Sequence, residues 1–204
     1  MLEDTILSKK HRQFIKFVKN HVSKNGIKLI IGRGKKVNAN GFLCDGYFDE
    51  YEKVIKVARH DPDFLQTLLH EYCHFLQWIR KTKIFKHSDK YCMIVERWLQ
   101  GKQYPKNKVR RAFYWVRRME RECEQIAATL IKKYDLPIDK SKYIKNANCY
   151  IYAHYFMETE RKYCAFRRSP FQSKGVQKVM PSNFKALSHK TMPKKIYRAM
   201  SRCM

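Results

Sequence analysis

The stretch LLHEYCHFLQW, residues 68–78, places two histidines and a glutamate inside an otherwise apolar segment. His70, Glu71 and His74 form the pattern H-E-x-x-H, in which the two histidines are four residues apart. On a helix, side chains four residues apart lie one above the other on the same face. Because a buried polar side chain without a partner is energetically costly, these three side chains need a common explanation.

A bound metal ion would explain the motif. Neutral imidazole is a good zinc ligand at about 2.0–2.1 Å, and His70 and His74 would present both rings to one point. Glu71 is rotated by about 100° from His70, so it can reach a metal-bound water without binding the metal. The metal lowers the pKa of the water, and the glutamate accepts its proton. The motif predicts a zinc-dependent hydrolase with Glu71 as the general base; the alternative is a pair of core histidines beside a chance glutamate.

A catalytic zinc needs a third protein ligand and an open fourth position. The segment ERECEQIAATL, residues 120–130, carries three glutamates at alternate positions before an apolar Ile-Ala-Ala run. They are conspicuous in a chain with 18 acidic and 44 basic residues. Glu120 and Glu124 share a helix face, whereas Glu122 lies on another. The alternative interpretation of this group is a solvent-exposed acidic edge.

The two motifs together resemble the gluzincin type of zincin metallopeptidases. In the ImmA/IrrE-like group, H-E-x-x-H is followed by E-x-x-A-N/D-x-F-A-A on the next long helix, and this chain has HEYCH at 70–74 and ERECEQIAA at 120–128. Metallopeptidase-like proteins of tailed bacteriophages are still more similar. They share H-E-x-C-H-x-x-Q-W, here at 70–78, and a later Y-x-x-x-A-N-x-Y segment, here at 143–150. The resemblance covers roughly residues 27–155.

The resemblance implies that Glu120 is the third zinc ligand. Glu124 matches the family's Asn or Asp, which implies a hydrogen bond to a ligating histidine. This chain has Cys123 in place of the usual alanine and Ile126 in place of phenylalanine. The implied activity is that of a zinc metallopeptidase acting on a protein or peptide, in the cytoplasm of the host cell if the gene is viral.

His87, thirteen residues after His74, is a competing third ligand. SprT-like DNA-associated proteases use a later histidine, and a basic chain would suit them. We expect His87 to lie in a polar, lysine-rich turn, where an exposed histidine needs no explanation, and therefore favour Glu120. His154, on a later aromatic segment, could polarise a substrate carbonyl, although core packing is the commoner role.

Hydrophobic periodicity predicts the elements around these motifs. Helices are expected over 4–24, 62–82, 88–100, 108–134 and 139–160, and strands over 27–34, 41–49 and 53–59. This order predicts an α+β fold. The resemblance implies its zincin-like form, with a small antiparallel or mixed sheet packed on the H-E-x-x-H helix, a long helix carrying the third ligand and a mostly helical C-terminal part. The resemblance also implies that the strand at 53–59, directly before the motif helix, is the edge strand that receives a substrate backbone.

The composition changes at residue 160. Residues 160–204 hold twelve Lys and Arg residues, one acidic residue and few aliphatic residues. We predict a zincin-like metallopeptidase domain over 1–159 and a basic C-terminal extension over 160–204, either loosely packed or wrapped around the domain.

The formal net charge of the whole chain, +26, predicts attraction to nucleic acid or to an acidic partner, although a basic surface alone specifies neither. The alternative function is therefore that of a basic nucleic-acid-binding protein, either an SprT-like DNA-associated protease or a non-catalytic zincin fold. A non-catalytic protein would bind DNA with a steep salt dependence and would not need Glu71.

The sequence also predicts a cytoplasmic chain without membrane contact. No apolar run approaches the roughly 18–20 residues of a membrane span, and the first residues, MLEDTILSKKHRQF, lack the apolar region of a signal peptide. The seven cysteines are scattered and never form C-x-x-C, which excludes a regular disulfide framework or thiolate zinc site and favours reduced thiols.

Overall fold

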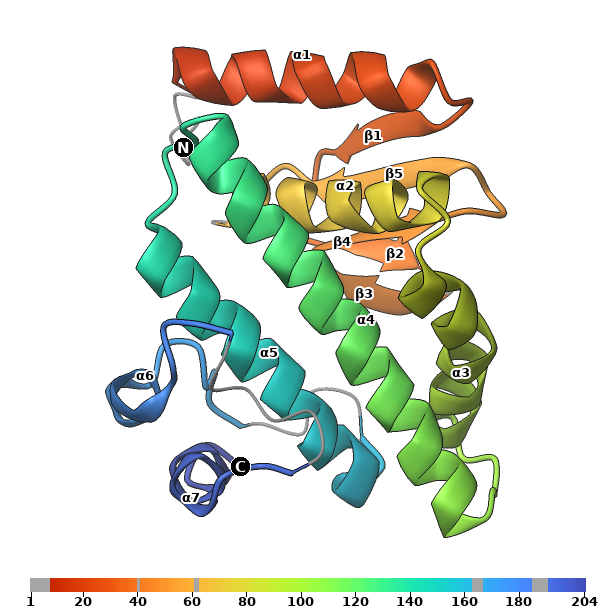
Figure 1. Cartoon of the computed structure of the whole chain (residues 1–204), viewed down its shortest axis with the longest axis vertical. Coiled ribbons are helices and arrows are strands. Elements are labelled where there is room, and N and C mark those ends of the chain that lie inside the picture. The colour runs from red at the N-terminus through yellow and green to blue at the C-terminus, as the bar shows by residue number, and fades with distance from the viewer. Residues whose placement is uncertain (1–7, 40, 61–62, 163–166, 185–190) are drawn as a thin grey trace. The chain divides into compact units, whose positions relative to one another are not determined.

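The computed structural model describes residues 8–39, 41–60, 63–162, 167–184 and 191–204, which form an α+β fold (Figure 1). Seven helices and five strands are found in these ranges. The chain divides into two compact units. Unit 1 comprises Met1–Arg80 and Ile126–Ile138, and unit 2 comprises Lys81–Gln125 and Asp139–Met204.

Unit 1 contains a mixed three-stranded sheet in the order β1–β5–β4. Its strands are β1 (Lys28–Gly32), β4 (Gly46–Asp49) and β5 (Val54–Ala58). β1 runs parallel to β5 and β4 runs antiparallel to it. The expectation that 53–59 is an edge strand is wrong, because β5 is paired on both sides and β1 and β4 are the edges.

The strand expected over 41–49 is divided in two at Asp45. Its first half, β3 (Phe42–Cys44), pairs with β2 (Val37–Ala39) as a short antiparallel hairpin, which forms a separate sheet. Its second half is β4. The carbonyl of Asp45 accepts a hydrogen bond from the amide of Ala58 at 2.8 Å. This bond holds the residue between β3 and β4 against the last residue of β5.

Two helices of unit 1 pack with the sheet (Figure 1): α1 (Lys9–Ser23) contacts β1, and α2 (Phe64–Ile79) contacts β4 and β5. α1 lies within the helix predicted over 4–24 and buries Phe14, Val18 and Val22, which follow one another at four-residue spacing on one face. α2 is the predicted motif helix and buries most of its length, because its apolar residues occupy more than one face.

Gly46 sets the close approach of α2 to β4. A Cβ atom at this position would lie 2.7 Å from Cγ2 of Thr67 and 3.0 Å from Cγ1 of Val57. Ring contacts continue the packing, since the ring of Phe48 on β4 lies 6.2 Å from Phe75 and 5.9 Å from Trp78 between centroids. The sheet therefore holds the motif helix in a fixed register.

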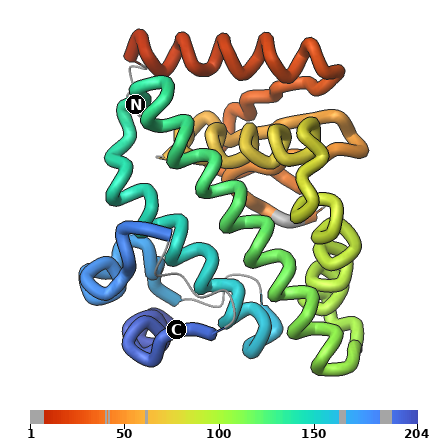
Figure 2. The backbone as a smooth tube through the Cα atoms, viewed as in Figure 1, coloured from red at the N-terminus to blue at the C-terminus, as the bar shows by residue number. Residues whose placement is uncertain are grey.

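Unit 2 is helical. Its elements are α3 (Lys83–Leu99), the first part of α4 (Lys106–Lys133), α5 (Lys140–Glu160), α6 (Lys174–Val179) and α7 (Lys194–Ser201). Figure 2 traces α4 as one uninterrupted helix, of which the part from Ile126 onward belongs to unit 1. α3 begins earlier than predicted because Thr82 caps it, accepting a hydrogen bond from the amide of Phe85 at 3.2 Å.

The basic segment after residue 160 contains two helices, α6 and α7, that pack into unit 2. Val176 of α6 and Ile196 and Met200 of α7 are fully buried in the core of unit 2. The Asn148 side chain of α5 donates a hydrogen bond to the carbonyl of Pro181 at 2.7 Å, which fastens the segment after α6. The division into units therefore does not fall at residue 160, because packing and not charge decides it. Across the described residues, no helix is both long and apolar enough to cross a membrane.

Candidate metal centre

His70 and His74 lie side by side on α2. Their Nε2 atoms are 3.1 Å apart and their ring centroids are 4.7 Å apart. Two nitrogens bound at about 2.0–2.1 Å to one tetrahedral zinc ion stand about 3.3 Å apart. Both rings are half-buried. The pair thus has the spacing that two ligands of one metal ion need, although a hydrogen bond between two neutral rings has a similar length.

Gln77 orients His74. The side chain of Gln77 is fully buried, and its Oε1 atom lies 2.9 Å from Nδ1 of His74. An amide oxygen only accepts hydrogen bonds, so Nδ1 of His74 carries the proton and donates it. The neutral ring then keeps a lone pair on Nε2, the atom that faces His70. The sequence signal for this role is the spacing of three residues, which puts Gln77 on the same helix face as His74.

Glu71 lies in a sheltered environment next to the β2–β3 hairpin. Its side chain is only 8% exposed. Burial raises the pKa of the Cys44 thiol on β3, and the negative charge of Glu71 raises it further, which places the two side chains within electrostatic reach. A carboxylate so shielded from solvent is suited to exchange a proton with a nearby group and not merely to solvate the surface.

The glutamates of α4 lie in unit 2 and differ in their surroundings. Glu120 and Glu124 are 6% and 5% exposed, so the alternative of a solvent-exposed acidic edge is wrong for both. Glu122 is half-buried and accepts a hydrogen bond from the hydroxyl of Thr82 at 2.7 Å. Because Thr82 also caps α3, Glu122 has a structural role that joins α3 to α4.

Glu124 accepts a hydrogen bond from the hydroxyl of Tyr143 at 2.5 Å. Tyr143 comes from α5, so this bond joins α4 to α5 inside unit 2. The hydrogen bond from Glu124 to a ligating histidine, which the family resemblance implies, stays a prediction. The contact with Tyr143 gives the buried carboxylate of Glu124 a hydrogen-bond partner.

Glu120 belongs to a buried polar group between α4 and α5. Burial lowers the pKa of His154, the negative charge of Glu120 raises it in part, and Arg117 lowers it. Nδ1 of His154 donates to the carbonyl of Tyr150 at 3.1 Å. Arg117 is buried as well and forms an ion pair with Glu158 at 2.8 Å. Glu120 is thus a carboxylate held inside unit 2 among polar neighbours.

His87 does not lie in a turn, as the sequence suggested, but within α3. Its ring packs on Trp115, with a centroid separation of 4.0 Å, and lies 5.6 Å from the ring of Tyr91. The turn prediction is wrong because Thr82 caps α3, so the helix begins at Lys83 and already includes His87. These contacts with aromatic rings explain the imidazole of His87 at this position, and no bound metal is needed to explain it.

The structure of unit 1 thus brings together His70, His74 and the residue that orients His74, with Glu71 on the same helix. Glu120 stands on the part of α4 that belongs to unit 2, and its role as the third ligand stays a prediction. Comparison of the chain with protein-family models, with curated proteins and with solved structures finds no match.

Proposed function

We propose that this chain is a zinc-dependent metallopeptidase, a hydrolase with a zincin-like fold. His70, His74 and Glu120 would hold the zinc ion, and Glu71 would be the general base. The observation that carries the proposal is the 3.1 Å separation of the two histidine Nε2 atoms, with His74 oriented by Gln77. A zinc ion, when bound, supplies Lewis acidity to a water molecule and to the carbonyl of the scissile peptide bond.

Glu71 performs the proton transfers in this proposal. Its carboxylate would accept a proton from the attacking water as the new C–O bond forms, and would then pass that proton to the amine nitrogen as the peptide C–N bond breaks. The adjacent position on α2 keeps Glu71 off the face of His70 and His74, which leaves it free to act as a base and not as a ligand. The low exposure of Glu71 supports this role, because bulk water competes less with the attacking water for hydrogen bonds to a sheltered carboxylate.

The third ligand would come from α4. Glu120 matches the ligand position of the resembled family and is a buried carboxylate, which is a common oxygen ligand of zinc. Cys123 is a second candidate, because it is buried, stands three residues further on the same face of the helix, and offers a thiol that together with two imidazoles forms a zinc-binding set. Variants at these two positions decide between them.

The edge strand β4 is the best place for a substrate backbone. Among the described strands, β4 is paired only with β5, so its other edge can pair with an extended peptide. β4 also packs on α2 through Gly46 and Phe48, and a peptide added there would run along the helix that carries His70. This proposal replaces β5, which has no free edge.

The alternative function is that of a nucleic-acid-binding protein with a non-catalytic zincin fold. Such a protein would not need the sheltered Glu71, which stands between His70 and His74 in the sequence. Zinc held for structure alone needs ligands and no base. A cytoplasmic location, in a host cell if the gene is viral, belongs to the same proposal as the peptidase activity.

The test is a cleavage profile of a cell proteome, comparing wild type with Glu71→Gln. The substitution keeps the size and polarity of the side chain and removes the proton acceptor. We expect zinc content and fold to be unchanged and new peptide termini to appear only with wild type. The same termini produced at the same rate by both proteins would show that Glu71 is not the base.

A further inference from the structure

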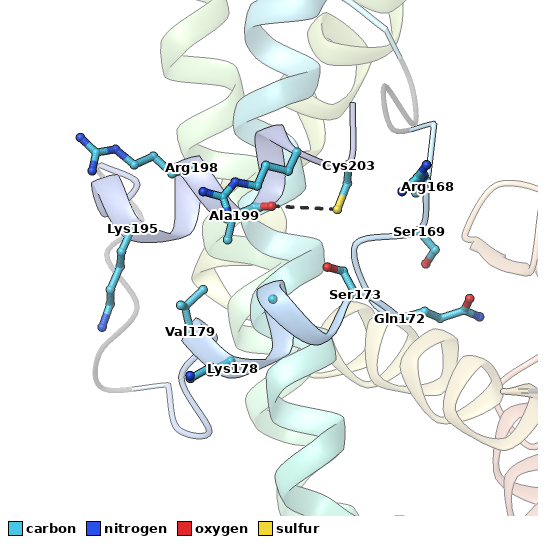
Figure 3. A pocket seen from close by; sticks show the side chains of 12 residues that line it. Arg168, Ser169, Gln172, Ser173, Lys178, Val179, Lys195, Arg198, Ala199 and Cys203 are labelled. Carbon is cyan, nitrogen blue, oxygen red and sulfur yellow. Dashed lines mark hydrogen bonds between the residues drawn. The ribbon is translucent and has the colours of Figure 1, made fainter.

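A pocket of about 770 Å³ opens in unit 2 between α6, α7 and the segment that precedes α6 (Figure 3). None of its lining residues belongs to the proposed zinc site. Its most distinctive lining residues are five cations, which come from three stretches of chain: Arg168, Lys178, Lys195, Arg198 and Arg202. Ser169 and Gln172 add neutral hydrogen-bonding groups on one side.

The charge of this pocket is uncompensated by side chains. No carboxylate side chain lines it, and the sequence contains no Asp or Glu after Glu160. Within the described part of the chain, none of the five cationic side chains forms an ion pair. All five are exposed. Five like charges around one concavity repel one another and concentrate a positive field, which favours an anion with several negative groups.

The walls of the pocket are held by the core of unit 2. Val176 of α6 and Met200 of α7 are fully buried and anchor the two helices in this core. The amide of Arg168 donates a hydrogen bond to the carbonyl of Cys203 at 3.0 Å, which links the segment before α6 to the residues that follow α7. Lys145 on α5 donates to the carbonyl of Gln177 on α6 at 3.1 Å. The cations therefore project from a scaffold that is formed before any ligand binds.

The composition of the lining indicates what kind of anion fits. Several cations spread over three segments match several phosphate groups in succession better than one isolated phosphate. No aromatic side chain lines the pocket, so it offers no surface on which a base could stack. Recognition would then rest on phosphates and not on base identity. The formal net charge of +26 adds long-range attraction for a long polyanion.

We propose that this pocket binds the phosphate backbone of nucleic acid without sequence preference. It would keep the protein on nucleic acid and so direct the proposed peptidase towards proteins bound there. The binding itself does not depend on zinc or on Glu71.

The test measures binding of the full chain to a fluorescent single-stranded oligonucleotide of about 20 nucleotides, from about 50 to 200 mM salt. The pocket variant is Lys195→Gln, Arg198→Gln and Arg202→Gln together. The matched control removes the same charge from exposed positions of α1 in unit 1, with Lys9→Gln, Lys16→Gln and Lys19→Gln. Circular dichroism verifies that both variants keep the fold, and Arg198→Gln alone serves if the triple variant does not.

Each single-stranded phosphate contact contributes about 0.7 to the slope of log affinity against log salt, so the pocket variant should lower the slope by about 2 and weaken binding at least about 10-fold at low salt. The single variant should lower the slope by about 0.7. The control should change the slope little, and an oligonucleotide of scrambled sequence should bind equally well. An equal loss in the pocket variant and the control would overturn the proposal, since the charge would then act as a diffuse background.

A second arm distinguishes the source of the phosphate. The oligonucleotide is replaced by a nucleoside triphosphate and by inorganic phosphate. Competition only at concentrations far above those of the oligonucleotide supports the proposal. Binding of the triphosphate without binding of the oligonucleotide would contradict it and assign the pocket to a small phosphorylated ligand. Glu71→Gln should bind the oligonucleotide like wild type, so a failure of the peptidase proposal does not affect this result.

Discussion

Oε1 of Gln77 lies 2.9 Å from Nδ1 of His74, and this hydrogen bond determines which nitrogen of the histidine is available to a metal. The donor must be the histidine, because the amide oxygen can only accept. The lone pair is thereby left on Nε2, 3.1 Å from Nε2 of His70. Gln77 is fully buried, so no solvent competes for the bond.

Replacing Gln77 by leucine should remove this orientation and weaken zinc binding by roughly 10–100-fold, as is typical when the partner of a ligating histidine is lost. Gln77→Glu is the matched control, because its carboxylate can still accept from Nδ1. Zinc affinity is measured by competition with a chromophoric chelator. Equal affinities for wild type and Gln77→Leu would show that the bond does not orient a ligand.

The glutamates of α4 should differ sharply in their effects on zinc. Glu120→Gln should weaken zinc binding by orders of magnitude, because a neutral amide replaces an ionised ligand. Glu122→Gln should leave zinc binding nearly unchanged, because the side chain at 122 is turned by about 200° from Glu120. The amide oxygen of the new glutamine can still accept the hydrogen bond from Thr82. Cys123→Ser tests the rival ligand. A loss of zinc with Cys123→Ser and not with Glu120→Gln would move the third ligand to the thiol.

Gly46→Ala should destabilise unit 1, because the new methyl group would lie 2.7 Å from Cγ2 of Thr67. Overpacking of this kind typically costs about 1–3 kcal/mol in the free energy of unfolding. The double variant with Thr67→Ser lacks the clashing Cγ2 atom and should recover part of the loss. Urea denaturation measures both. If the single variant is as stable as wild type, α2 is not held against β4 as closely as described.

His21 should make folding sensitive to mild acid. Burial lowers the pKa of His21, and the positive charges of Arg80 and Lys24 lower it further; its Nδ1 atom lies 2.6 Å from the hydroxyl of Tyr72. With the folded pKa below the unfolded value of 6.5, the unfolded state binds more protons. With respect to His21, the free energy of unfolding is therefore at its full value above about pH 6.5. It decreases as the pH falls towards the folded pKa of His21.

An NMR titration of the imidazole measures this directly and should give a pKa below that of an exposed histidine. His21→Gln should make the free energy of unfolding depend less on pH between about 7 and 5. A His21 resonance that titrates at or above pH 6.5 would contradict the prediction.

The fold could be predicted from the sequence where the hydrophobic pattern is long and regular. The stripe of Phe14, Val18 and Val22 identified α1, and the apolar residues around the motif identified α2. α6 and α7 were missed because they have only six and eight residues and few apolar side chains among many cations. The central place of β5 was also missed, since its parallel pairing with β1 joins strands that are not adjacent in the chain.

The site could be predicted to the extent that it is local. The helical spacing of His70 and His74 was sufficient to place their rings together, because four residues make one turn of a single helix. The role of Gln77 was missed, since a glutamine at the end of an apolar segment has many structural explanations. A third ligand from another helix depends on tertiary packing, which spacing in one sequence does not specify.

Elemental analysis of protein purified without chelators measures whether His70 and His74 hold one zinc ion. We expect about one zinc per chain in wild type and none in His70→Ala, with circular dichroism confirming that the variant is folded. His87→Ala, which removes a histidine packed on Trp115, is the control and should keep the full zinc content. Unchanged metal content in folded His70→Ala, or no metal in wild type even after zinc is added, would show that the two histidines are not zinc ligands. They would then be a hydrogen-bonded pair in the core.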